Sequence, residues 1–378
     1  MSWICERILW IILFLLVIIV IYVQHPMFWA SPKWKRLERI KKSNHYKRGQ
    51  FKNLSKTPLM TYSKVSPRWN EWLYLLKRAK EWVRPPKLPV IQTDLHSIDK
   101  KKNYMVWFWH SSYYIQLDWK SFLIDPTLET WAPVPFVNRS FPWTNIYKPK
   151  DIPEVDYLII THDHYDHLDY FTVKALKKRI KYVVCWLWVW AHFEKWGFKP
   201  EQLIELEWWE DYKTEWLHIT ALPSRHFSWR FLRPNNTLWA WFMLESKSKN
   251  IYIAWDWWYD TFYKEIWKNF DIDYAIVENG QYSMGWRYIH TLPEQLHQTI
   301  SDLWAKYVIP AHNSKYALST HLWDDPLRIL SNEAKKYHFN LLTPMIWEII
   351  DLDAREYHFK KWREEVENNF HLFPKKEW

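Results

Sequence analysis

Glycine is nearly missing from this sequence of 378 residues, which has four glycines and 32 tryptophans. At the usual frequency of about 7%, a chain of this length would hold roughly 26 glycines. Some tryptophans stand where the backbone favours glycine. Asp118-Trp119 falls between two alternating apolar runs, where Asp-Gly is the preferred hairpin turn. Trp255 and Trp258 flank Asp256 just past an expected strand, where bulky side chains hinder close backbone approach.

We therefore hypothesise that many of these tryptophans are glycine in the natural protein. Some bacterial lineages decode UGA as glycine, and reading UGA as tryptophan would produce this pattern. The alternative is a protein that is truly rich in tryptophan, and the codons for Trp119, Trp255 and Trp258 decide between the two. Four tryptophans in apolar or aromatic contexts are expected to be genuine: Trp208, Trp209, Trp239 and Trp323.

Cysteine is scarce as well, since only Cys5 and Cys185 are present, which excludes a disulfide framework. The sequence also lacks the G-x-S-x-G, Walker and G-x-G-x-x-G patterns of serine hydrolases, nucleotide hydrolases and dinucleotide-binding domains. A hydrophobic content of 48% argues against a disordered protein. The net charge of +10 suits nucleic acid, an anionic membrane or an anionic substrate, without choosing between them.

An unbroken apolar run extends over residues 8–23, and no charge occurs between Arg7 and Lys33. This length is sufficient to span a bilayer. A cleaved signal peptide is the alternative, but Arg7 is balanced by Glu6 and no clear small-x-small cleavage site follows. The sequence therefore favours an uncleaved, single-pass membrane anchor.

The segment that follows is strongly basic, with eight Lys and Arg residues against one Glu over residues 33–48. Such a segment binds anionic headgroups and tends to stay in the cytoplasm. We expect a protein of the bacterial cell membrane whose large domain is cytoplasmic. The expected divisions are an anchor at 1–30, a basic segment and connecting arm at 31–100 with a short helix near 69–82, a main domain at 101–360 and a charged tail at 361–378.

Strands and helices alternate from about residue 102, which indicates an α/β domain. A helix is expected at 171–180. The expected strands are 104–109, 113–117, 121–124, 155–160, 181–186, 218–222, 238–245, 250–254, 274–278 and 307–310.

The strongest chemical signal follows the apolar run 155–160 and reads Thr161-His162-Asp163-His164-Tyr165-Asp166-His167. Imidazole and carboxylate groups are ligands for zinc, and also for iron or manganese. An isolated histidine is usually a packed or surface residue, but this spacing after a strand favours a metal site. A strand-to-helix turn directs His162 and His164 toward one ion, and Asp166 and His167 toward a second.

Later strand ends offer the remaining ligands. His226 comes after the strand 218–222, Asp256 directly after 250–254, and His312 after 307–310. Each residue alone is a weak signal, because polar residues are common where strands end. Together they complete two sites.

The order His162-x-His164-x-Asp166-His167, then His226, Asp256 and His312, resembles the signature of the metallo-β-lactamase superfamily. Within it, the chain looks like the branch of the N-acyl-phosphatidylethanolamine-hydrolysing phospholipase D and its bacterial relatives, from about residue 28 to 350. The segments that carry this second resemblance are Trp109–Ser112 with Asp125-Pro126, Glu205–Trp209, Ser224–Ser228, Thr237–Trp239, His290 with Pro293-Glu294, and Ala311-His312 through Pro326.

The resemblance implies an αββα sandwich behind the N-terminal transmembrane helix, and a role for each site residue. His110 and Asp125 match supporting positions outside the ligand set, and His290 matches a histidine that assists proton transfer or binds phosphate, although a purely structural role is equally open. Asp166 and His290 are the residues expected to take part in catalysis. By the resemblance, His162, His164 and His226 hold one metal, Asp166, His167 and His312 hold the other, and Asp256 bridges them.

The function that this implies is a two-metal hydrolase, with zinc as the first choice and iron or manganese as alternatives. A pair of divalent metals lowers the pKa of a shared water and stabilises negative charge on a phosphoryl oxygen. The expected reaction is cleavage of a phosphodiester by a metal-bridging hydroxide, in an N-acylated phospholipid at an anionic membrane surface. The alternatives are a lactonase or a nuclease on the same fold, and a membrane scaffold without activity. Nucleic acid is the less favoured partner, because the basic residues concentrate beside the membrane segment.

Overall fold

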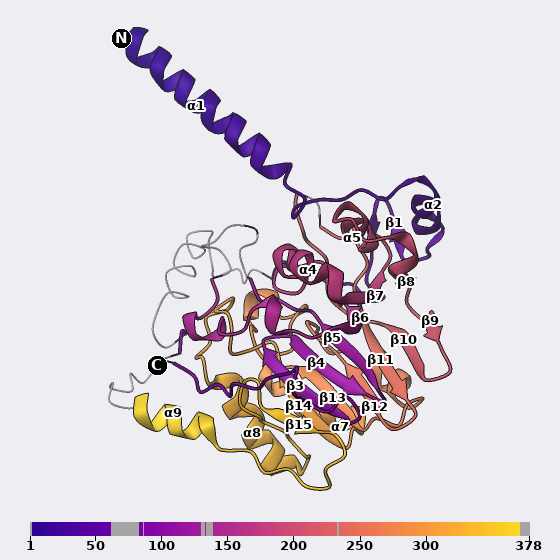
Figure 1. Ribbon diagram of the computed structural model, residues 1–378. Helices are drawn as coiled ribbons and strands as arrows, with labels where there is room; N and C mark the ends of the chain where they lie inside the picture. The colour runs from indigo at the N-terminus through magenta and orange to yellow at the C-terminus, as the bar shows by residue number, and fades with distance from the viewer. Residues whose placement is uncertain are drawn as a thin grey trace.

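The computed structural model of the chain describes residues 2–61, 83–85, 87–129, 133, 139–232 and 234–370. The short helix expected near 69–82 lies outside these residues. The expected α/β sandwich is confirmed, with two β-sheets packed face to face and helices on both outer faces (Figure 1).

The first sheet has seven strands within the described residues. All of them except β15 come from the first half of the main domain. Its antiparallel hairpins β3-β4-β5 continue into parallel pairs from β5 to β8. In spatial order the strands are β15 (Ile349–Asp351), β3 (Tyr104–Trp109), β4 (Ser112–Leu117), β5 (Lys120–Ile124), β6 (Val155–Ile159), β7 (Ile180–Trp186) and β8 (Leu203–Leu206).

The second sheet has six strands over the same part of the chain. β9 to β12 pair antiparallel, whereas β12, β13 and β14 run parallel. In spatial order the strands are β14 (Tyr307–Ala311), β13 (Tyr274–Glu278), β12 (Asn250–Ile253), β11 (Ala240–Ser246), β10 (Leu217–Pro223) and β9 (Asp211–Lys213). The strands β8, β9 and β15, of three or four residues each, were missing from the sequence-based expectation.

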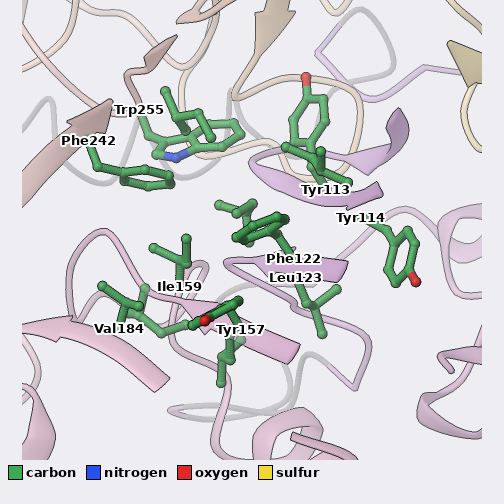
Figure 2. Packing of buried hydrophobic residues seen from close by; sticks show 14 of the residues in the cluster. Tyr113, Tyr114, Phe122, Leu123, Tyr157, Ile159, Val184, Phe242 and Trp255 are labelled. Carbon is green, nitrogen blue, oxygen red and sulfur yellow. The ribbon is translucent and has the colours of Figure 1, made fainter. Parts of the chain in front are cut away.

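The two sheets bury an aromatic-rich core between them. Figure 2 shows Tyr113, Phe122 and Val184 of the first sheet together with Phe242 and Trp255 from the second half of the chain. The rings of Tyr113 and Trp255 lie 5.1 Å apart. Because burial of apolar side chains is the main favourable term in folding, this interface holds the two sheets together.

The helices cover the outer faces of the sheets. α6, α7 and α8 pack on the second sheet through residues such as Trp267, Ile300 and Leu330. α4 and α5 cover the first sheet (Figure 1). The helix expected at 171–180 is shorter, since β7 begins at Ile180. The bounds are α4 (Tyr170–Leu176), α5 (Trp190–Lys195), α6 (Phe262–Trp267), α7 (Pro293–Leu303) and α8 (Asp325–Tyr337).

The N-terminal helix α1 (Ser2–Val23) stands away from the domain (Figure 1). The helix over residues 3–23 is long and apolar enough to cross a membrane, and none of its residues is buried in the domain. The basic segment forms α2 (Trp34–Lys42) and a small hairpin of β1 (Tyr46–Lys47) and β2 (Gln50–Phe51). Arg36 and Arg39 of α2 both pair with Glu205 of β8, so part of this basic segment binds the domain itself.

The C-terminal segment also differs from a free charged tail, because it begins with α9 (Trp362–Phe370). Trp362 is buried in the main core, and its indole N–H donates to the carbonyl of Pro344 at 3.2 Å. The packed domain therefore reaches at least to Trp362.

Within the described residues, six tryptophans have a left-handed backbone conformation: Trp109, Trp119, Trp188, Trp209, Trp304 and Trp347. Residues with a β-carbon rarely adopt positive φ, whereas glycine does so freely. Asp118 and Trp119, with φ of 46° and 68°, have the positive φ values that an Asp-Gly hairpin turn requires. The backbone conformation therefore favours glycine at these six positions, although Trp109, Trp188 and Trp347 also pack in the core.

Two expectations about individual tryptophans change with the structure. Trp209 was expected to be genuine, but its φ is 74° and its side chain is 55% exposed, as at a glycine position. Trp255 and Trp258, in contrast, are not among the residues with positive φ, and Trp255 packs in the core. Glycine at Trp255 and Trp258 thus finds no support in the backbone conformation.

We expect Trp304→Gly to raise the free energy of unfolding by about 1 kcal/mol, because it removes the strain of a left-handed residue with a side chain. Trp304 has a φ of 54° and is 85% exposed, so little buried surface is lost. Urea unfolding of the full chain in detergent, followed by circular dichroism, measures the change. Trp216→Gly is the control, because Trp216 is 47% exposed and has no positive φ. Equal effects of the two substitutions would contradict a backbone origin.

Candidate metal centre

All the candidate site residues gather at one edge of the sandwich. The parallel strands β5, β6, β12 and β14 end there, and each is followed by a site residue or a group of them. Loops beyond the carboxyl ends of parallel strands are the usual place for ligands in α/β proteins. The edge is lined from both sheets, since Asp125 and 162–167 follow the first sheet, and His226, Asp256 and His312 follow the second.

Four of these residues form a first group. The imidazoles of His162, His164 and His226 and the carboxylate of Asp256 have ligand atoms that all lie within 4.8 Å of one another. The rings of His162 and His164 are 4.3 Å apart, and those of His162 and His226 are 4.9 Å apart. Three imidazoles and one carboxylate are a suitable donor set for zinc.

A second group lies beside the first and consists of His110, Asp166, His167 and His312. The rings of His162 and His167 are 4.0 Å apart, which places the two groups next to each other. His110 belongs to this group by position, but its Nε2 lies 3.0 Å from Oδ2 of Asp166 and therefore holds that carboxylate. This contact suits the supporting role expected for His110.

Asp256 lies between the two groups. Its Oδ2 is 3.6 Å from Nε2 of both His162 and His226 in the first group, and 3.3 Å from Nε2 of His167 in the second. Its Oδ1 is 2.9 Å from Nε2 of His312. One carboxylate therefore faces ligands of both groups, as a bridging residue must.

Four of the five expected ligand histidines use Nδ1 for a contact with the protein. His162 contacts Thr161, His226 contacts the carbonyl of Ile289, His167 contacts Asp125 at 2.7 Å and His312 contacts Glu278 at 3.1 Å. Such contacts fix the ring and direct Nε2 toward a metal.

The Nε2 atoms are left without hydrogen bonds. Among the described residues, Nε2 of His162, His164, His167, His226 and His312 is buried and makes no hydrogen bond. Buried polar atoms normally have partners, so five converging orphan nitrogens need an explanation. Divalent cations fit these donors and satisfy them.

The electrostatics of the first group agree with this fit. Burial is the main cause that holds the pKa of His162 and His226 well below the usual value, so both rings are neutral and able to bind metal. Burial acts to raise the pKa of Asp256, but His312 and His167 outweigh it and hold that pKa well below its ordinary range. The bridging position therefore carries a negative charge.

Asp125 and His290 lie beside the ligands. Asp125 accepts the backbone N–H of Thr161 at 2.9 Å and contacts His167, which suits the expected supporting role. His290 stacks on His312, with ring centroids 5.3 Å apart, and its Nδ1 contacts Oε1 of Glu278.

Glu278, the last residue of β13, was not assigned a role from the sequence. It is fully buried, and its Oε1 contacts Nδ1 of both His290 and His312. Its Oε2 accepts the backbone N–H groups of Trp257 at 2.8 Å and Thr291 at 3.2 Å. This carboxylate thus holds the loop beside Asp256 and two site histidines. Only its place at a strand end was visible in the sequence, because the partners come from three separate segments.

Asp163 differs from the other acidic residue of the motif. Its Oδ1 accepts the backbone N–H of Trp229 at 3.1 Å, and it belongs to neither ligand group. Burial raises the pKa of Asp163 to about 6. Asp163 therefore fixes the segment that follows His226.

Comparison with known families agrees with the fold and the site. Residues 120–313 match the beta-lactamase superfamily domain, which is half of the chain. The chain belongs to the metallo-β-lactamase superfamily. It is a metal-dependent hydrolase of this fold with a buried His/Asp site, and the site is consistent with two metal ions.

Three known proteins indicate how distant the relatives are. An uncharacterized protein of Mycobacterium tuberculosis is 28% identical over 331 residues, which is 82% of this chain and 84% of that protein. The N-acyl-phosphatidylethanolamine-hydrolyzing phospholipase D 1 of Caenorhabditis elegans is 26% identical over 246 residues, covering 60% of this chain and 67% of the other. An isothiocyanate hydrolase from Delia radicum gut bacteria shares the fold, with a TM-score of 0.51, 19% identity, and coverage of 66% of this chain and 100% of that one.

We expect Glu278→Gln to weaken metal binding by about 10–100-fold. Both carboxylate oxygens of Glu278 face N–H groups, and in glutamine one of these oxygens is replaced by an NH₂ group, which cannot accept a hydrogen bond. Titration of the metal-free protein with Zn²⁺ against a competing chelator measures the affinity. The matched control is Glu205→Gln, since Glu205 is a mostly buried carboxylate that pairs with Arg39 away from the site. Unchanged zinc affinity in Glu278→Gln would contradict the orienting role.

Proposed function

We propose that the chain is a membrane-anchored phosphodiesterase that cleaves an N-acylated phospholipid, in the manner of a phospholipase D. The observation that carries the two-metal part of the proposal is the carboxylate of Asp256 between two groups of orphan imidazole nitrogens. The lipid part is supported by the similarity to the Caenorhabditis elegans phospholipase D and by the apolar helix α1. In this proposal α1 anchors the chain in a bacterial membrane, with the domain on the cytoplasmic side.

Each residue has a role in the proposed reaction. His162, His164 and His226 hold one cation, Asp166, His167 and His312 hold the other, and Asp256 contacts both. When bound, a pair of divalent cations, for which Zn²⁺ is the first choice, lowers the pKa of water and neutralises charge on a phosphoryl oxygen.

His290 lies beside the cation site and is the second proposed catalytic residue, with Asp166. Its Nδ1 is held by Glu278, so Nε2 is the atom that can exchange a proton with the leaving group or bind a phosphate oxygen. The stack of His290 on His312 keeps this nitrogen close to the ligands.

A nuclease receives less support. Arg36 and Arg39 of the basic segment pair with Glu205, which leaves fewer free charges for a phosphate backbone. A lactonase or an inactive scaffold would keep the same ligands, so these alternatives are outcomes of the assay below.

Measurement of metal content distinguishes the proposed role of Asp256 from that of His290. Asp256→Asn should lower the content of both metals, because it weakens the carboxylate that faces both ligand groups. His290→Ala should retain two metals per chain and lower turnover by about 10²-fold or more. Elemental analysis of purified protein gives the metal content. Equal loss of metal in the two variants would refute this division.

We expect the anchored chain to release N-acylethanolamine from vesicles that contain N-acylphosphatidylethanolamine, and to lose this activity when a chelator removes the metals. Liquid chromatography with mass spectrometry identifies the product. Single-stranded RNA and an acyl-homoserine lactone are parallel substrates. Cleavage of either instead of the lipid would favour the nuclease or the lactonase, and no cleavage by a protein with two metals would favour the scaffold.

A further inference from the structure

An apolar cavity of about 510 Å³ adjoins the metal centre. The metal ligands His164 and Asp166 line one part of it. Most of the remaining wall is aromatic or aliphatic and comes from Phe28, Phe227, Phe231 and Leu232. The ring of Phe227 lies 4.5 Å from the ring of His164, so the apolar wall begins at the ligands themselves.

The same wall continues to the base of α1. Phe28 follows this helix by a few residues, and its ring lies 5.2 Å from the ring of Tyr22 in the last turn of α1. On its other side, Phe28 lies 5.7 Å from the ring of Phe231. α1 has 22 residues, which at about 1.5 Å per residue match a hydrocarbon core of about 30 Å. If α1 spans a bilayer, Phe28 and the cavity lie at the membrane surface.

A buried arginine fixes this arrangement. The side chain of Arg230 donates from Nε to the carbonyl of Met27 at 2.8 Å and from a terminal nitrogen to the carbonyl of Asp163 at 2.7 Å. Its guanidinium lies 4.5 Å from the ring centre of Tyr165. Since Asp163 also accepts the backbone N–H of Trp229, three segments are joined. These are the chain after α1, the metal loop and the segment 227–232.

The outer side of the segment 227–232 exposes large apolar side chains. Trp229 is 52% exposed and Leu232 is 79% exposed, both at the rim of the cavity. Tryptophan is enriched at membrane interfaces, and transfer of an exposed leucine side chain from water into hydrocarbon lowers the free energy. The exposed rim is continuous with α1 through Phe231, Phe28 and Tyr22.

We propose that this cavity takes an acyl chain of a lipid from the leaflet at the C-terminal end of α1, and that Trp229 and Leu232 insert into that leaflet. The lipid then enters with its acyl chain against the apolar wall and its headgroup toward His164 and Asp166. Membrane insertion of the rim rests on the proposed anchoring by α1, and the reaction rests on the proposed function. Insertion of the rim into the leaflet is measurable without turnover.

The first test places a probe on the rim. Leu232→Cys in a Cys5→Ser background is labelled with the fluorophore NBD, and the full chain is reconstituted in nanodiscs of phosphatidylethanolamine and phosphatidylglycerol. Cys185 is buried and stays unlabelled. Lipids with a doxyl group on the acyl chain should quench the probe about twofold or more.

The control for this test is Trp304→Cys with the same label, because Trp304 is exposed at the C-terminal end of α7 and lines no part of the cavity. Quenching at position 232 but not at 304 supports the proposal. Equal quenching at both positions, or none at 232, overturns it. Quenching at 232 that depends on protein concentration and vanishes in singly occupied nanodiscs would assign the rim to contact with a second copy, and would overturn it as well.

The second test measures the ratio of two rates. Trp229→Ser combined with Leu232→Ser should lower the ratio of vesicle hydrolysis to hydrolysis of bis(p-nitrophenyl) phosphate by about tenfold or more. The control Trp216→Ser, at an exposed position outside the cavity, should leave this ratio unchanged. An unchanged ratio in the double variant contradicts the proposal. If the unsubstituted chain hydrolyses neither substrate, the proposed function fails, and the quenching result still decides whether the rim binds lipid.

Discussion

The convergence of imidazole nitrogens on the carboxylate of Asp256 is the constraint on which this structure depends. Two ligand groups share this residue, and their members come from loops of both sheets. Bringing so many polar groups together in a buried place is costly unless each finds a partner. The aromatic interface between the sheets supplies the rigid frame, and a pair of divalent cations would satisfy the nitrogens that the protein leaves free. Packing and metal binding therefore support each other.

A second layer of contacts keeps the ligands in place. Asp125 and Glu278 are buried carboxylates on opposite sheets, and each contacts Nδ1 of a ligand histidine. A carboxylate behind a ligating imidazole fixes its orientation and makes it a stronger donor. Because Glu278 also accepts backbone N–H groups next to Asp256 and His290, it couples the position of the shared carboxylate to that of the proposed catalytic histidine. The geometry of the site thus depends on the supporting carboxylates Asp125 and Glu278 as well as on the ligands.

Much of this was predictable from the sequence, because strands with apolar alternation are followed directly by the site residues. The run 155–160 and the cluster after it need only local pattern to be recognised, and strand β13 was expected with its observed bounds. Contacts between distant segments were not predictable. Glu278 joins residues far apart in the chain. In the sequence, Arg36 and Arg39 look like part of a free basic segment, and only the structure shows that they pair with Glu205. The conformation of Trp209 depends on a turn that its apolar neighbours conceal.

If α1 anchors the chain in a membrane, as we propose, the pairing of Arg36 and Arg39 with Glu205 also affects how the domain meets that membrane. Charges bound to the protein attract headgroups weakly, and what remains of that attraction is screened by salt. Contacts at the junction between α1 and the domain act differently from such charges, because they fix the direction in which the domain faces relative to the helix. Arg230 is buried and hydrogen-bonded to both Met27 and Asp163, so the segment just after α1 is tied to the metal loop. In the proposed anchoring by α1, this buried contact would determine the orientation of the site toward the bilayer more than the basic segment does.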